Sequence, residues 1–175
     1  MKKFTAALLL VAIGFAGFAQ SVKWYGFEEA LELSKKKPKK IFIDVYTDWC
    51  GWCKVYDRNT FSDPAIAEYL NKHYYPVKFN AEGNDTINFK GHVFTNSGDG
   101  RRSTHALAAS LLNGKMSYPT VVFMSEQLQL LHVQPGYLTP EQFAPFMVYM
   151  GEGIYATKTT WEEFNKTFKW PVEKK

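Results

Sequence analysis

Residues 40–53 read KIFIDVYTDWCGWC, and this stretch decides the fold. It joins an apolar, β-rich run, 40–46, to the only two cysteines of the chain, Cys50 and Cys53. At a helix start, thiols three residues apart lie on one side, about 5–6 Å from each other, which suits an unstrained disulfide. The free N–H groups and the positive dipole end of such a helix stabilise a thiolate, the nucleophilic form of cysteine. The stretch therefore predicts a redox site.

The first 19 residues have the pattern of a secretory signal peptide. Lys2 and Lys3 form a positive n-region, residues 4–18 form an apolar core, and small residues precede a cut near Ala19. The apolar run is shorter than the about 20 residues that span a bilayer. We expect export, cleavage near Ala19 and a soluble periplasmic or secreted product that begins at Gln20. The alternative is an uncleaved N-terminal anchor, because the length of the segment is borderline.

Composition and charge limit the classes of protein to which the chain can belong after signal-peptide cleavage. Residues 20–175 are one domain's worth of chain, and the full 175-residue sequence is 46% hydrophobic, which is enough for a real core. Loss of Lys2 and Lys3 lowers the formal charge from +4 to +2, which leaves no electrostatic footprint for nucleic acid. The basic cluster 35–40 is expected in a solvated turn between a helix and a strand, with a membrane-surface patch as the alternative. A lone cysteine pair closing so short a loop adds little stability, so redox chemistry explains it better.

Hydrophobic spacing and turn signals predict alternating helices and strands. Asp63 is expected as the N-cap of one helix, and Thr160 opens a capping box with Glu163. The segment 81–103 is irregular, with a small hairpin inside it. We count about 83–103 as an insertion and about 153–175 as a C-terminal extension. Helices are expected from 27 to before Pro38, over 50–60, 64–73, 105–112 and 140–150, and from 161. Strands are expected over 41–46, 75–80, 119–124 and 128–133, and the strands of the small hairpin over 87–90 and 92–94.

Three motifs, in this order, resemble the thioredoxin superfamily. Residues 43–54 look like its active-site segment, 116–120 like its cis-proline segment, and 135–137 like the glycine after its last strand. The resemblance covers residues 24–150. It implies an α/β thioredoxin fold with a central mixed β-sheet flanked by helices. An insertion before the cis-proline strand and an extra C-terminal helix would be additions to that fold.

The resemblance also implies catalytic roles. Cys50, exposed at the helix start, looks like the attacking nucleophile, and Cys53 looks like the thiol that resolves the mixed disulfide. Asp44 matches the family's buried aspartate, whose raised pKa lets it take the proton from Cys53. Lys78 falls where the family often has a lysine near that aspartate. The alternatives are a solvated strand-edge carboxylate for Asp44 and a solvated side chain for Lys78.

Five residues are expected to bind substrate. The Tyr118–Pro119 bond is expected to be cis and to face the cysteines, with Tyr118 shaping the groove for an extended substrate. Gly136 follows the last strand of the family's sheet. Trp49 and Trp52 would add apolar surface around the sulfurs. Core packing is the alternative for both tryptophans, although Trp52, between the cysteines, is the better surface candidate.

Metal and haem sites do not suit this sequence. A C-x-x-C half-site needs a second cysteine pair or closely spaced histidines, and the four histidines are widely scattered. A c-type haem needs histidine after the second cysteine, where Lys54 stands. We therefore expect no metal and no cofactor.

These residues lead to the hypothesis of an exported thiol–disulfide oxidoreductase. It would exchange disulfides with envelope proteins through Cys50 and Cys53 as a reductase or isomerase, and the Gly51-Trp52 dipeptide leaves the direction of electron flow open. The expected partners are protein thiols and disulfides and a membrane electron relay, without nucleic acid and without stable membrane insertion. The alternative is a peptide-binding thioredoxin-like module with a structural or vestigial disulfide.

Overall fold

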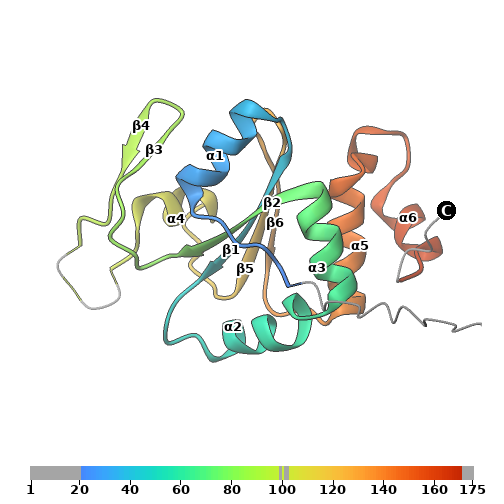
Figure 1. The fold of residues 1–175 in the computed structure, drawn as a ribbon. Coiled ribbons are helices and arrows are strands. Elements are labelled where there is room, and N and C mark those ends of the chain that lie inside the picture. Colours follow the sequence, from blue (N-terminus) through green and yellow to red (C-terminus); the bar gives the residue numbers. More distant parts are fainter. Residues whose placement is uncertain (1–20, 99, 101–102, 171–175) are drawn as a thin grey trace, which may run out of the picture.

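The computed structural model describes residues 21–98, 100 and 103–170, with a sheet at its centre (Figure 1). The predicted signal peptide, 1–19, lies outside the described residues. Within the described part of the chain, no helix is both long and apolar enough to cross a membrane.

The sheet has the strand order β2-β1-β5-β6. Its members are β1 (Lys40–Tyr46), β2 (Tyr74–Asn80), β5 (Thr120–Met124) and β6 (Leu130–Pro135). β1 pairs in parallel with β2 and antiparallel with β5, and β6 closes an antiparallel hairpin at the edge. β1 is central and covered on both faces, which explains its nearly continuous apolar sequence.

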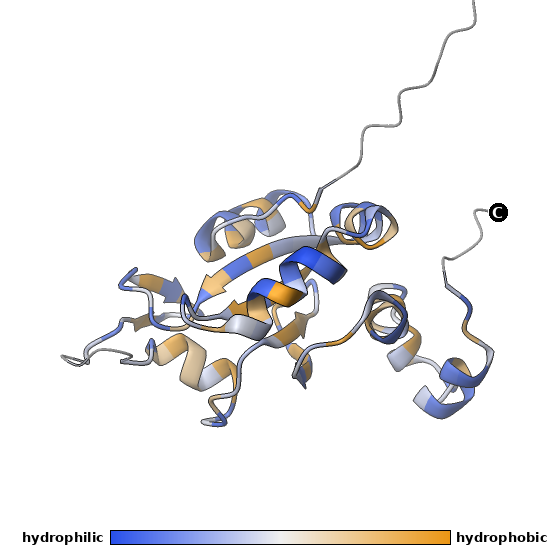
Figure 2. Ribbon diagram, turned by 90° about the horizontal axis from the view of Figure 1, so that it is seen from below, coloured by the Kyte–Doolittle hydropathy of each residue, from blue (hydrophilic) through white to orange (hydrophobic). Residues whose placement is uncertain are grey.

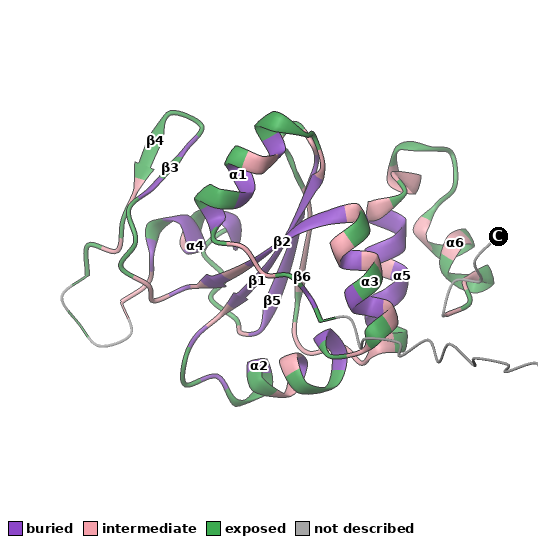
Figure 3. Cartoon of the chain, viewed as in Figure 1, coloured by how far each residue is buried: buried purple, intermediate pink, exposed green. Residues whose placement is uncertain are grey.

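Helices cover both faces of this sheet (Figure 1). Alternate residues of β1 point to opposite faces, so Ile43 packs in one buried cluster and Phe42 in the other. Figure 2 shows hydrophobic residues in the strands and along parts of the helices, and Figure 3 shows the helix sides that face the sheet as buried. The helices are α1 (Phe27–Lys36), α2 (Gly51–Tyr56), α3 (Pro64–His73), α4 (Ala106–Leu111), α5 (Pro140–Gly151) and α6 (Trp161–Thr167), with a π-helical turn η1 (Asp57–Phe61) and a 3₁₀ turn η2 (Ile154–Ala156).

The predicted helix starts are confirmed where the cap lies in the local sequence. Asp63 accepts hydrogen bonds from the N–H groups of Ala65 and Ile66. Thr160 and Glu163 form the expected capping box. The helix expected over 50–60 instead ends as an α-helix at Tyr56 and continues as η1.

The basic cluster gives one correction. Lys40 is not in a solvated turn: it begins β1, and its side chain is largely buried. Its Nζ forms an ion pair with Glu126 at 2.8 Å and donates to the carbonyl of Gly151 at 3.2 Å. A buried lysine needs such partners, and they come from segments far away in the sequence.

The hairpin in the insertion is confirmed. β3 (Ile87–Phe89) pairs antiparallel with β4 (His92–Phe94). The segment is tied down where it leaves and rejoins the fold, because the Asn96 side chain donates to the carbonyls of Glu82 and Ser103 at 3.2 and 2.9 Å. The chain enters the insertion just after β2 and close to the end of β1, because the N–H of Ala81 donates to the carbonyl of Tyr46 at 2.8 Å.

Candidate active site

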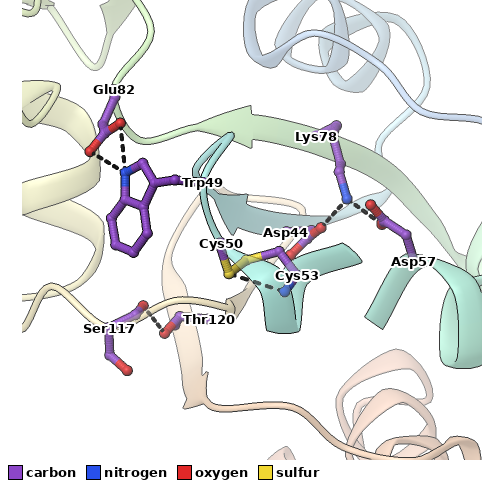
Figure 4. The surroundings of a disulfide bond; sticks show 9 residues. All are labelled: Asp44, Trp49, Cys50, Cys53, Asp57, Lys78, Glu82, Ser117 and Thr120. Atoms are coloured by element: carbon purple, nitrogen blue, oxygen red, sulfur yellow. Dashed lines mark hydrogen bonds and ion pairs between the residues drawn. A yellow bond between two sulfur atoms is a disulfide. The ribbon is translucent and has the colours of Figure 1, made fainter. Parts of the chain in front are cut away.

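The two cysteines form a disulfide at the start of α2 (Figure 4). Cys50 is the N-cap residue, and its Sγ accepts a hydrogen bond from the N–H of Cys53 at 3.0 Å. The Cα atoms are 5.3 Å apart, within the expected range. After reduction, this N–H and the helix dipole are placed to stabilise a thiolate on Cys50.

The expected exposure of Cys50 is wrong for this oxidised state. The residue is 4% exposed, and Cys53 is 2% exposed. Both cysteines are therefore buried while the disulfide is closed.

A buried carboxyl group lies behind the disulfide. Asp44 is 0% exposed and shares the face of β1 that carries Phe42, toward α2. Its Oδ2 accepts a hydrogen bond from Nζ of Lys78, whereas its Oδ1 is buried without a partner. Burial raises the pKa of Asp44 from 3.8 to about 6, against the lowering effect of the Lys78 ammonium. The expected burial of Asp44 and its contact with Lys78 are confirmed.

Lys78 joins the buried acid to a second one. Its Nζ also bonds Asp57, whose side chain is half-exposed. Burial alone would lower the pKa of Lys78, but the two carboxylates outweigh it and raise that pKa. Lys78 and Asp57 border a cavity of about 390 Å³, which is also lined by Trp24 and Phe61. Sequence reasoning missed Asp57, although its place four residues after Cys53 on one helix side was a usable signal.

Both tryptophans of the motif lie at the surface, so core packing is wrong for each. Trp49 is 50% exposed and Trp52 is 62% exposed. The Trp49 ring meets Tyr118 edge-on at 6.1 Å, and its Nε1 donates to Glu82 at 2.9 Å. Trp52 stacks on Tyr137 at 5.6 Å. Figure 4 shows Trp49 on one side of the disulfide and the Asp44–Lys78 pair on the other.

The expected cis bond before Pro119 is confirmed, and the glycine after β6 lies beside that proline. The Tyr118–Pro119 bond is cis, and the N–H of Gly136 donates to the carbonyl of Pro119 at 2.8 Å. Gly136 has a φ of +87°, a conformation that glycine adopts readily. The hydroxyl of Thr120 donates to the carbonyl of Ser117 at 2.7 Å and fixes the other end of the segment.

Metal-ligating side chains are not gathered at this site. Among the described residues, no group of three or more His, Cys, Asp or Glu side chains is arranged to hold a metal ion. His105, for example, is buried and caps α4, with its ring nitrogens bonded to the backbone at Leu107 and Asp85.

This fold and this disulfide define a thioredoxin-like protein with a C-x-x-C pair at the start of a helix. A family model named Thioredox_DsbH and described as "Protein of unknown function, DUF255" matches residues 16–171. The chain belongs to this family.

Two proteins are similar to this chain in sequence. An uncharacterized protein of Archaeoglobus fulgidus is 33% identical over 76 residues, which are 43% of this chain and 60% of that protein. The thiol:disulfide interchange protein DsbD of Photorhabdus laumondii is 26% identical over 110 residues, 63% of this chain and 16% of DsbD. The chain thus spans 60% or less of the length of these two relatives.

The structural matches establish the fold. A DsbH oxidoreductase superposes with a TM-score of 0.55 and 16% identity, covering 85% of this chain and 95% of that one. A thioredoxin from Thermus thermophilus gives a TM-score of 0.55 and 16% identity, with coverage of 79% and 99%.

Proposed function

We propose that the protein is an exported oxidoreductase that reduces or reshuffles disulfides of envelope proteins through Cys50 and Cys53. One observation carries the proposal: the disulfide at the start of α2 lies in front of the buried acid Asp44, which has one oxygen held by Lys78 and one oxygen free. A disulfide that only staples the chain has no use for a buried proton acceptor.

The reaction follows from this arrangement. In the reduced protein, the Cys50 thiolate attacks a substrate disulfide, forms a mixed disulfide and releases the first substrate thiolate. Cys53 then gives its proton to the carboxylate of Asp44, and its thiolate attacks Sγ of Cys50. The second substrate thiolate leaves, and the Cys50–Cys53 disulfide of this structure is the product. Two electrons have passed to the substrate.

Asp44 suits the role of base in the second step. A pKa of about 6 leaves it mostly ionised at neutral pH, yet closer to a thiol's pKa than an ordinary aspartate. Its unpartnered Oδ1 is the atom that can receive the proton. Lys78, bonded to Oδ2, holds the carboxylate in place and keeps it ionised.

The rim of the site suits extended peptide segments with apolar side chains. Trp49 and Trp52 are exposed large aromatic residues, and Tyr118 stands directly before cis Pro119. An extended substrate can pair with the backbone of residues 117–119 while its side chains contact these rings. Specificity would then come from the aromatic contacts and not from charge.

The proposal also includes export of the protein and a source of electrons for its disulfide. Residues 1–19 would be removed as a signal peptide, which leaves residues 20–175 as one thioredoxin-like domain with an insertion at about 83–103 and an extension from about 153. The match to a protein named as a thiol:disulfide interchange protein supports protein thiols and disulfides as partners. Re-reduction of the Cys50–Cys53 disulfide requires a dithiol donor, for which we propose a membrane electron relay.

A Cys53→Ala variant tests the proposal by trapping. Without Cys53, the mixed disulfide on Cys50 cannot be resolved, so we expect covalent adducts with envelope proteins. Non-reducing electrophoresis and mass spectrometry should detect these adducts, and dithiothreitol should release them. The matched control is the double variant Cys50→Ala/Cys53→Ala, which should form none.

The contrary result is equally clear. If the Cys53→Ala variant forms no more adducts than the double variant, Cys50 does not attack partner disulfides. The chain would then be a peptide-binding module in which the disulfide has no turnover.

A further inference from the structure

Three buried side-chain oxygens near the disulfide lack a hydrogen-bond partner. Among the described residues, they are Oδ1 of Asp44, the hydroxyl of Thr47 and the hydroxyl of Tyr56. Buried polar groups are almost always hydrogen-bonded, because leaving one unpaired is costly. These residues come from β1, the loop after it and α2, which are the elements that hold the cysteines. The mechanism above uses only Asp44, so the two hydroxyls need an explanation.

Tyr56 shares an interior with the buried acid. It lies three residues after Cys53, on the same side of α2, and both residues are buried. It packs in the cluster that contains Phe42, and Asp44 is on the same face of β1 as Phe42. The α2 side that carries Tyr56 therefore faces the strand side that carries Asp44.

The tyrosine ring is held firmly in that position. It stacks on Phe61 at 4.4 Å and meets Tyr137 and Phe143 edge-on at 5.4 and 6.0 Å. Burial, then the charge of Asp44, then Tyr137 raise the pKa of Tyr56 well above its usual range. The hydroxyl therefore keeps its proton and stays a hydrogen-bond donor at working pH.

The other charged groups around the acid are few. Lys78 on β2 bonds Oδ2 of Asp44, and Asp57 on η1 bonds Lys78 from the solvent side. Among the described residues, neither of these groups bonds Oδ1. An ionised Asp44 therefore needs a donor for Oδ1, and the unpartnered hydroxyl of Tyr56 is a donor in the same interior.

We propose that Tyr56 is a positioning residue for the proton-transfer step: in the reduced protein its hydroxyl donates, directly or through one bridging water, to Oδ1 of ionised Asp44. The inference rests on the proposed function of Asp44 as the base for Cys53. The hydrogen bond stabilises the carboxylate before the transfer. When Cys53 gives its proton to Oδ1, the Tyr56 hydroxyl turns from this oxygen, and the Cys53 thiolate is left to attack Cys50.

A Tyr56→Phe variant tests this role, because it keeps the ring and removes one hydroxyl. We expect the pKa of Asp44 in the reduced protein to rise by about one unit, since the charged form loses a donor. The measurement is a carboxyl ¹³C NMR titration of aspartate-labelled protein. The pH profile of the Cys53-dependent release of a mixed disulfide should move upward by the same amount.

Tyr74→Phe is the matched control. Tyr74 is fully buried in the same cluster, but its hydroxyl donates to the carbonyl of Met147 at 2.6 Å. Its loss should leave the Asp44 titration unchanged. A Tyr56→Phe protein with the wild-type pKa of Asp44 would overturn the proposal.

A second measurement needs no variant, so it tests the proposal even if the Tyr56→Phe protein does not fold. In wild-type protein labelled with ¹³Cζ-tyrosine, the Tyr56 resonance should titrate with the pKa of Asp44, and a resonance without that inflection would overturn the proposal. Both titrations are independent of turnover. Failure of the proposed function appears instead as absent trapping by the Cys53→Ala variant, whatever the titrations show.

Discussion

A Cys50→Ser variant should lose disulfide reduction by a factor on the order of 10⁴ or more. A serine hydroxyl is not ionised near neutral pH and cannot form the mixed disulfide, so the first step of the reaction disappears. The structure places only Cys50 at the N-cap of α2, where the N–H of Cys53 points at its sulfur. The measurement is the reduction of a protein disulfide such as insulin, with dithiothreitol as the electron donor.

The matched control is Cys53→Ser. This variant keeps the attacking thiol, so without dithiothreitol it should form one equivalent of mixed disulfide with insulin, whereas Cys50→Ser should form none. Both variants lose the same disulfide. Because this disulfide joins residues only three positions apart, it adds little stability, and the two variants should have similar free energies of unfolding. A Cys50→Ser protein that still reduces insulin at the wild-type rate would show that the nucleophile has been assigned to the wrong sulfur.

An Asp44→Asn variant should be more stable than the wild-type protein at pH 8, by roughly 3 kcal/mol, and equally stable at pH 3. The pKa of Asp44 is raised from 3.8 to about 6, so the folded state binds the proton more tightly than the unfolded state. The protonated Asp44 carboxyl therefore stabilises the folded state. This stabilisation is complete below the unfolded pKa of 3.8 and is lost as the pH rises through about 6. A difference of about two pKa units corresponds to roughly 3 kcal/mol.

The same variant should turn over more slowly, by a factor on the order of 10², because Cys53 loses its base. Urea unfolding of the oxidised protein at the two pH values measures stability, and insulin reduction measures turnover. Asp57→Asn is the control, because its half-exposed carboxyl should give no comparable gain in stability. A less stable Asp44→Asn protein at pH 8, or one with wild-type turnover, would contradict the role of Asp44.

Local signals in the sequence predicted most of the fold. The N-cap at Asp63 and the capping box at Thr160 are decided by three or four neighbouring residues, and the structure confirms both. The helix expected from residue 27 is α1, and its apolar spacing places Phe27, Ala30 and Leu31 on its buried side. The family resemblance predicted the burial of Asp44 and its contact with Lys78, which no local pattern defines.

The remaining features depend on contacts between distant residues. Lys40 is buried because Glu126, 86 residues away, pairs with it. Trp49 is held by Glu82, 33 residues away, and Trp52 by Tyr137, and no local pattern predicts either contact. Cys50 is buried in the oxidised protein, which its position at a helix start did not predict.

The reduction potential of the Cys50–Cys53 pair tests the central claim most directly. The fluorescence of the neighbouring tryptophans, Trp49 and Trp52, should report the fraction reduced in glutathione or dithiothreitol buffers. A redox-active pair should titrate reversibly, toward roughly −270 mV for a reductase or about −180 mV for an isomerase. A pair that resists reduction well below about −300 mV would be a structural disulfide, and that result would contradict the account.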